Sequence, residues 1–144
     1  MDLSCFATKE LADEGVVFPV KIDGTKVPLA LKIYGSDSDV VKDYDLARVR
    51  KFGLLKDKKE LDDDATEELI ESQNEAAVIR IGGLWAYDWK KKTTTDEPVE
   101  LFGRKLGCDK ASYEYLCEKM PAIKEFVFEK SNERNNFLSL GKKN

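Results

Sequence analysis

The stretch CDKASYEYLCEKMPAIKEFVFEKSNERNNFL, from Cys108 to Leu138, constrains the fold more than any other part of this sequence. Its apolar side chains recur every three or four residues on both sides of Pro121, which is the spacing of two short amphipathic helices. Asp109 is typical of a helix N-cap, and Pro121 suits the first turn of the second helix, where no backbone N–H is needed. No two side chains here form an obvious acid–base or nucleophilic pair, so we expect this region to work by packing against other protein.

The two helices present different apolar faces. In the first, the apolar stripe consists of Tyr113, Leu116, Cys117 and Met120. In the second, it consists of Ile123, Phe126 and Val127. Phe128 points away from the second stripe and therefore either covers another element or forms an exposed apolar surface.

The N-terminal part predicts a β-hairpin over residues 16–34. Asp23-Gly24 lies between two strand-forming runs and is a strong signal for a two-residue turn, because both central positions of a type I′ turn have positive φ. Pro19 and Pro28 cannot donate a hydrogen bond to a sheet, so we expect an edge ribbon or a bare two-stranded arm. Since a lone hairpin is only marginally stable, it must pack on the helices or on a neighbouring subunit.

Two longer helices are predicted between the hairpin and the C-terminal stretch. The first covers residues 39–52 and ends at Gly53, and the second covers 65–81 and ends at Gly82-Gly83. A charged linker at 56–64 separates them. The residues expected to face inward from the first of these helices are Val40, Val41, Tyr44 and Ala47.

An aromatic strand and a polar loop follow. Trp85, Tyr87 and Trp89 alternate with other residues, so they share one face if residues 84–89 are extended. Residues 90–96 read as a polar loop. The whole pattern predicts a helix-dominant α+β fold with about four helices, the N-terminal β-hairpin and a further short strand near residues 84–89. We expect a single domain over residues 1–136 and a flexible C-terminal tail over 137–144.

The composition lowers the expectation of catalysis. The chain has 144 residues, 36% of them charged, a formal net charge of −4 and no histidine, so it lacks the usual general base and the commonest metal ligand. The average charge repels nucleic acid and anionic membrane surfaces. Cys5, Cys108 and Cys117 are too few and too widely spaced for a disulfide framework, which indicates reduced thiols in a cytosolic protein. The N-terminus has no secretion signal, and no run approaches the length of a membrane span.

Three clusters of charged residues could bind a cation, contact nucleic acid or catalyse a reaction, but each also has a simpler structural explanation. The aspartates at 37, 39 and 62–64 could hold a cation, but they lack EF-hand spacing and suit helix capping and solvation. The lysines at 90–92 beside three aromatics could contact nucleic acid, although a surface loop is the simpler interpretation. Glu67, Glu68 and Glu71 could pair on one helix face in a small enzyme, but no phosphate loop or metal signature accompanies them. We therefore expect no catalytic, cofactor-binding or metal-binding residues.

Three blocks, in this order, resemble the tail assembly chaperones of lambda-like long-tailed bacteriophages. The first runs from Phe18 to Asp39 and ends in the Gly-Ser-Asp-Ser-Asp step into a helix. The second is Gly83-Leu84-Trp85 with Glu97-Pro98-Val99 beyond it, which is similar to the family's Gly-Trp segment and its short Glu-Pro-containing strand. The third is the C-terminal helix pair, with Met120-Pro121-Ala122 at its junction and Asn135-Asn136-Phe137-Leu138 at its end. The resemblance covers roughly residues 16–140.

The resemblance implies a non-enzymatic role in tail morphogenesis. Proteins of this family bind the tape measure protein, help to recruit tail tube subunits in the host cytoplasm, and are absent from the mature virion. The resemblance also implies a longer product made by programmed frameshifting, and Gly141-Lys142-Lys143-Asn144 could be encoded by an adenine-rich slippery sequence. The nucleotides of these codons test that hypothesis. We expect a homo-oligomer that needs no cofactor.

Six aromatic side chains are the candidate partner-binding residues, although aromatic stripes usually pack inward. They are Trp85, Tyr87, Trp89, Phe126, Phe128 and Phe137. An alternative function is a structural phage component, such as a tail-completion or head–tail connector protein. Presence in purified virions would favour that alternative. A very long coiled-coil reading frame directly downstream is what the chaperone interpretation expects.

Overall fold

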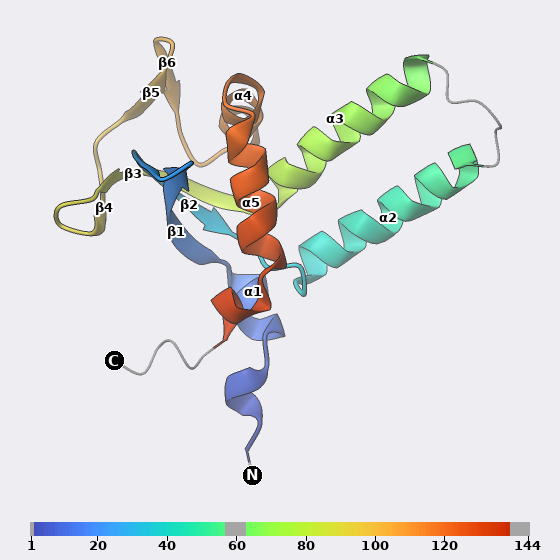
Figure 1. Ribbon diagram of the computed structural model, residues 1–144, viewed down its shortest axis with the longest axis horizontal. Helices are drawn as coiled ribbons and strands as arrows, with labels where there is room; N and C mark the ends of the chain where they lie inside the picture. The colour runs from blue at the N-terminus through green and yellow to red at the C-terminus, as the bar shows by residue number, and fades with distance from the viewer. Residues whose placement is uncertain (1, 57–62, 139–144) are drawn as a thin grey trace.

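A four-stranded antiparallel sheet, in the order β1-β2-β3-β4, lies at the centre of the computed structural model (Figure 1). The structure describes residues 2–56 and 63–138, except the side chains of Cys5 and of residues 51–70. The strands are β1 (Val16–Ile22), β2 (Thr25–Ile33), β3 (Ile81–Asp88), β4 (Thr93–Thr95), β5 (Val99–Leu101) and β6 (Arg104–Leu106). The helices are α1 (Lys9–Glu14), α2 (Asp39–Lys56), α3 (Asp63–Ile79), α4 (Lys110–Lys119) and α5 (Ala122–Asn132), with 3-10 turns η1 (Ser4–Phe6) and η2 (Arg134–Phe137).

The prediction of a helix-dominant fold with one hairpin and one further strand is wrong. The described chain is α+β with five helices and six strands in two antiparallel sheets, about 47% helix and 28% strand. Strand β4 was expected to be loop, because three exposed or half-exposed threonines carry no alternating apolar pattern. The β5–β6 hairpin was missed because its turn is Phe102-Gly103, and phenylalanine is not a turn residue.

The N-terminal hairpin has the predicted turn but a different place in the sheet. Asp23 and Gly24 have φ of 50° and 81°, as a two-residue turn between twisted strands requires. The expectation of an edge or bare ribbon is wrong for β2, which pairs with β1 on one side and β3 on the other. Pro28 is tolerated there because the pairing with β3 begins only at Leu29, and the ladder with β1 is interrupted opposite it.

The boundaries of the two central helices also differ from those predicted. Helix α2 continues through Gly53 to Lys56, since one glycine costs a helix only about 1 kcal/mol. Helix α3 ends at Ile79, and the glycines at 82 and 83 belong to β3 instead of ending the helix. Of the predicted linker, residues 57–62 lie outside the described part of the chain.

The main core fills the space between the sheet and the C-terminal helices. Cross-strand partners share a face of a sheet, so Val20, Leu29, Leu31, Ile33 and Leu84 form one buried face. Helix α5 contacts β1 and β2 and covers this face with Ile123, Phe126 and Val127. In α2, Val41 is buried as expected, but Val40 and Ala47 are exposed, because only one side of this helix meets the body.

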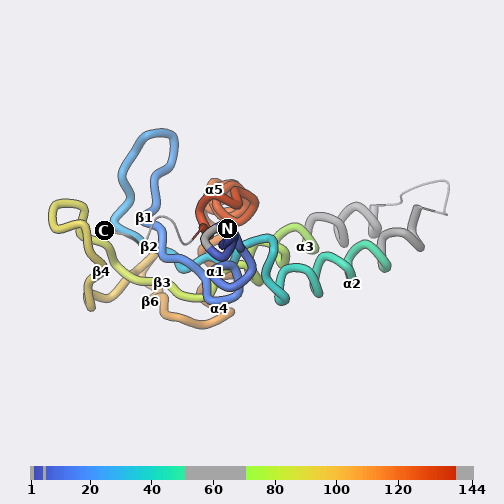
Figure 2. Tube along the Cα trace, turned by 90° about the horizontal axis from the view of Figure 1, so that it is seen from below, coloured from blue at the N-terminus to red at the C-terminus, as the bar shows by residue number. Residues whose placement is uncertain are grey.

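Helices α2 and α3 form an antiparallel arm that extends away from the sheet. Both views show the two helices side by side, reaching out from the body of the molecule (Figures 1 and 2). Beside the start of α2, the N-terminal and C-terminal segments meet, where Leu11, Ala12 and Phe137 form a small second core. The arm therefore has far less of its surface covered than α5, which lies across the sheet.

Candidate functional site

Trp85 lies on the face of the sheet opposite α5. It pairs with Ala30, whose neighbours Leu29 and Leu31 point into the core, so Trp85 and Ala30 point the other way. The Trp85 ring folds across Gly83, where a Cβ atom would lie only 2.2 Å from the ring. Glycine at position 83 therefore leaves the space that the half-buried indole occupies.

Tyr87, near the end of β3, packs against Trp89, which follows the strand. Their rings pack edge to face with centroids 5.1 Å apart. The Trp89 Nε1 donates a hydrogen bond of 2.7 Å to the Val27 carbonyl, and the Lys26 ammonium lies 5.5 Å from the centre of the ring. Both aromatics are half-buried and held in place, so they form a fixed wall rather than a loose patch.

The other three predicted residues do not join this surface. Phe126 is 7% exposed and Phe137 is 1% exposed, and each belongs to a core. Phe128 is half-buried, and the Arg80 guanidinium lies 5.0 Å from the centre of its ring. The structure thus packs Tyr87 against Trp89, keeps the Trp85 ring over Gly83 on the same strand, and places the three C-terminal phenylalanines elsewhere. Of the predicted tail, residues 139–144 lie outside the described chain.

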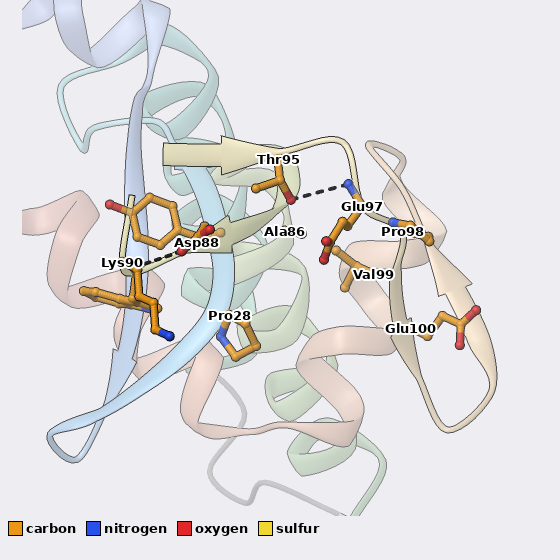
Figure 3. Close-up of a pocket in the computed structure, with 11 residues that line it drawn as sticks. Pro28, Ala86, Asp88, Lys90, Thr95, Glu97, Pro98, Val99 and Glu100 are labelled. Carbon is orange, nitrogen blue, oxygen red and sulfur yellow. Dashed lines mark hydrogen bonds between the residues drawn. The ribbon is translucent and has the colours of Figure 1, made fainter. Parts of the chain in front are cut away.

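A pocket of about 500 Å³ opens beside Tyr87 and Trp89, between the end of the sheet and β5 (Figure 3). Its remaining lining comes from Pro28, Ala86, Asp88, Lys90, Thr95, Glu97, Pro98, Val99 and Glu100. Figure 3 shows Glu97 and Val99 facing Pro28 and Ala86 across the pocket. Three carboxylates against one ammonium give the pocket an acidic rim around apolar walls.

A second pocket, of about 480 Å³, lies where the arm meets α5. It is lined by Arg48, Gln73, Pro121, Lys124, Glu125 and Phe128. Its rim carries two cations and one carboxylate, so its charge is opposite to that of the first pocket. The Lys124 ammonium is itself held by the Asn74 side chain at 2.7 Å.

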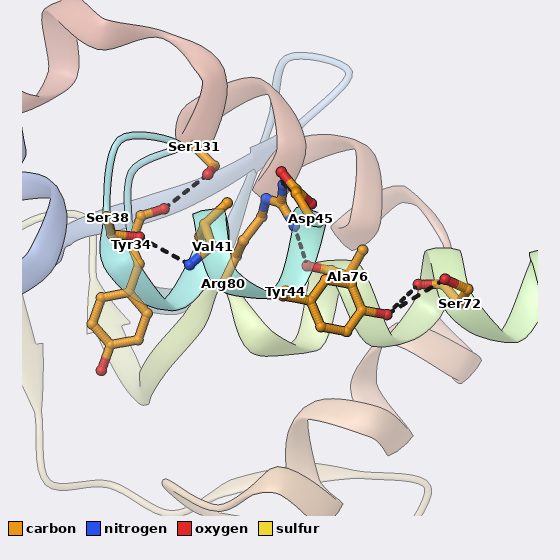
Figure 4. Close-up of polar contacts among 9 residues, drawn as sticks. All are labelled: Tyr34, Ser38, Val41, Tyr44, Asp45, Ser72, Ala76, Arg80 and Ser131. Atoms are coloured by element: carbon orange, nitrogen blue, oxygen red, sulfur yellow. Dashed lines mark hydrogen bonds and ion pairs between the residues drawn. The ribbon is translucent and has the colours of Figure 1, made fainter. Parts of the chain in front are cut away.

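Polar contacts fasten the base of the arm (Figure 4). The Arg80 side chain is 5% exposed, donates to the Ala76 carbonyl at 2.6 Å and pairs with Asp45 at 3.3 Å. Burial lowers the pKa of Arg80, and the Asp45 carboxylate acts in the opposite direction. The Tyr44 hydroxyl donates to the Ser72 carbonyl at 2.9 Å, and burial raises the pKa of this phenol. These contacts join α2 to α3 close to the sheet.

Seven large apolar side chains are exposed among the described residues, and none of them was predicted as functional; three of them, each more than half exposed, lie on α2 or at the β5–β6 turn. Leu46 and Val49 on α2 are 52% and 68% exposed, and Phe102 is 78% exposed. Leu46 and Val49 are three residues apart and off the stripe expected to face inward, which was the available sequence signal. Phe102 carried no signal, because its β-hairpin was not recognised.

The Cys117 thiol and the Tyr113 phenol are not activated. Burial raises the pKa of Cys117 to about 11 and that of Tyr113 to about 12, so both are protonated at neutral pH. The Cys108 thiol is tied to the Leu84 backbone, donating to its carbonyl at 3.3 Å. These groups therefore serve packing and hydrogen bonding.

Within residues 2–56 and 63–138, no three histidine, cysteine or acidic side chains gather closely enough to hold a metal ion. In the same part of the chain, no helix combines the length and the apolar character needed to cross a membrane. No protein-family model, no curated protein and no solved structure matches this chain.

Proposed function

We propose that this protein is a non-enzymatic tail assembly chaperone of a long-tailed bacteriophage. In this proposal it binds the tape measure protein in the host cytoplasm, helps to recruit tail tube subunits, works as a homo-oligomer and is left out of the mature virion. The resemblance of the three sequence blocks supports the family. The observation that carries a client-binding role is the projecting arm with its uncovered apolar side chains.

The arm supports this role through the position of two side chains. Leu46 and Val49 are three residues apart on α2, so they lie on one helix face. Both are more than half exposed, on an element whose outer surface the body of the protein leaves open (Figure 1). A tape measure protein is long and helical, and an amphipathic helix packs its apolar stripe against such a surface.

Co-purification with the client tests the proposal. The chain is expressed with a tagged fragment of the long coiled-coil protein that the same phage genome encodes, and the amount retained on the tag is measured. We expect retention of the wild-type chain. The double variant Leu46→Glu/Val49→Glu should bind at least roughly tenfold more weakly, because it removes apolar burial worth about 1.5 kcal/mol or more per side chain.

A matched control variant distinguishes specific binding by this surface from non-specific binding by exposed apolar side chains. Leu3 and Phe6 are 64% and 58% exposed but lie near the N-terminus, away from the arm. The variant Leu3→Glu/Phe6→Glu should be retained like the wild type. Failure of the wild-type chain to be retained by any tape measure fragment contradicts the function, and equal retention of both variants contradicts the assignment to the arm.

Mass spectrometry of purified virions separates the chaperone from a structural component. A chaperone is released before the tail is complete, so its peptides should be absent while those of the tail tube are abundant. A head–tail connector or tail-completion protein would be present at a fixed number of copies. That result would replace the proposed function with the alternative.

A further inference from the structure

We propose that the pocket beside Tyr87 and Trp89 receives Phe102 from a second copy of this chain, so that two copies exchange the tips of their β5–β6 hairpins. The exchange gives each copy one inserted aromatic ring and one filled pocket. This inference rests on the proposed function for its purpose, since it names a surface for the homo-oligomer.

Phe102 is the first observation. It has φ of 51°, in the left-handed region that bulky side chains rarely adopt, and Gly103 follows it at 76°. Its ring is 78% exposed, more than that of any other large apolar side chain in the described chain. Asparagine or aspartate would suit this turn better. A strained backbone that presents an uncovered aromatic ring indicates a contact outside the chain.

The shape of the pocket is the second observation. Its volume of about 500 Å³ leaves room for a phenyl ring, and Tyr87 and Trp89 are among the residues that line it. Pro28, Pro98 and Val99 supply further apolar surface. An apolar ring gains by leaving water for such a surface.

The charges around the two pockets favour this one, and not the one at the base of the arm, as the site for the Phe102 turn. Arg104 and Lys105 follow the Phe102 turn, and both are exposed. The rim of the first pocket has three carboxylates and the Lys90 ammonium and so attracts them, whereas the rim of the second has Arg48 and Lys124 against Glu125 alone and so repels them. In the part of the chain that the structure describes, no salt bridge involves Glu97, Glu100, Arg104 or Lys105. Lys105 lies opposite Glu100 in the β5–β6 ladder, and the Arg104 guanidinium lies 4.5 Å from the centre of the Tyr115 ring. Pairing with a second copy therefore exchanges contacts within one chain for contacts between two chains.

The position of the two features favours a two-fold dimer. The ring at Phe102 and the pocket residue Glu100 belong to one hairpin, only two residues apart. When two copies meet through a two-fold axis, the same patch is used on both sides, and each residue contact occurs twice. A single interface therefore fills both pockets and pairs both sets of charges.

Sedimentation over a concentration series tests the role of Phe102. The variant Phe102→Gly removes the ring and suits positive φ, so it should fold at least as well as the wild type. We expect its dimer dissociation constant to rise at least tenfold, whereas Phe6→Ser, at another exposed ring, should dimerise like the wild type. A wild-type chain that stays monomeric, or a Phe102→Gly chain that dimerises normally, overturns the inference.

A charge exchange tests the pocket itself. Arg104→Glu/Lys105→Glu in one chain and Glu97→Lys/Glu100→Lys in another should each abolish dimers, because like charges meet. An equimolar mixture should restore dimers, since each variant complements the other. A mixture that stays monomeric overturns the inference. Retention of wild-type and Phe102→Gly chains by the tape measure fragment is measured separately, and retention without dimers rejects this surface while the proposed function stands.

Discussion

Arg80 is the residue on which the attachment of the arm depends most. Its guanidinium is buried against Phe128 and held by the Ala76 carbonyl and Asp45, yet its Nε has no hydrogen-bond partner among the described residues. Desolvating a charge is expensive, and the half-exposed Asp45 repays only part of that cost. The side chain therefore contributes through the packing of its stem as well as through its charge.

Three substitutions at this pair have distinct expected effects on the free energy of unfolding. Arg80→Met keeps the stem and removes the buried charge, so it should change stability by no more than about 1 kcal/mol. Arg80→Ala removes the stem as well and should cost about 3 kcal/mol. Asp45→Ala should cost only about 1 kcal/mol, because water screens the half-exposed carboxylate.

Urea denaturation measures all three, with Asp43→Ala as the control on the same helix. Asp43 is exposed, so its removal should have little effect. If Asp45→Ala is no more destabilising than Asp43→Ala, the ion pair does not stabilise the arm. If Arg80→Met is as harmful as Arg80→Ala, the charge matters more than the stem.

Residues whose role depends only on their own backbone preference could be predicted from the sequence. Asp23-Gly24 and Asp109 act through their own backbone preferences, and both were assigned correctly. Phe102 could not be predicted, because its conformation runs against the preference of its side chain. The burial of Phe126 and Phe137 depends on which elements cover them, which the spacing of apolar residues does not specify.

At the scale of elements, the start of α4 depends on one cap. The Asp109 carboxylate accepts a hydrogen bond from the Ser112 N–H at 2.7 Å. Asp109→Ala should lower the free energy of unfolding by about 1 kcal/mol, whereas Asp109→Ser should retain most of the stability, because serine also caps. Chemical denaturation measures the difference, and equal stability of the alanine variant and the wild type would show that the cap is dispensable.

Asp37 joins three elements and makes stability depend on acid pH. Its carboxylate receives two hydrogen bonds from Arg134 in η2, at 3.0 and 3.1 Å, and one from Thr8 before α1, at 2.6 Å. The Arg134 bonds, followed by the Thr8 bond, lower the pKa of Asp37 below its ordinary 3.8. A lowered folded-state pKa gives stability that is present above pH 3.8 and is lost as the pH falls through the folded-state pKa.

Urea unfolding between about pH 6 and about pH 2 tests this dependence. The wild type should lose more stability on acidification than Asp37→Asn, by about 1 kcal/mol for the partly exposed ion pair. Asp43→Asn serves as the control and should follow the wild type. Identical acid dependence of Asp37→Asn and the wild type would contradict the role of this carboxylate.

Long elements could be predicted from the sequence better than short ones. The apolar spacing located α2, α3, α4 and α5, and the turn signal located the β1–β2 hairpin. Helix α1 has six residues and β4, β5 and β6 have three each, which is too short for periodicity to emerge. Their pairing depends on tertiary contacts, and so the pocket between β3, β4 and β5 could not be predicted.

At the scale of the whole molecule, the fold separates two kinds of surface. The arm exposes Leu46 and Val49, whereas the β5–β6 hairpin and its pocket lie on the other side of the sheet (Figure 1). In the proposed function, copies that dimerise through one surface keep the other free for the tape measure protein. Such an assembly can cover a long client with many small proteins.

Complementation of a phage that lacks this gene tests the central claim most directly. The measurement is the number of complete tails, counted by electron microscopy, when the gene is supplied from a plasmid. We predict that the wild type restores tails, whereas Leu46→Glu/Val49→Glu leaves the tape measure protein without tails and Leu3→Glu/Phe6→Glu restores them. Normal tails in the absence of the gene would contradict the account.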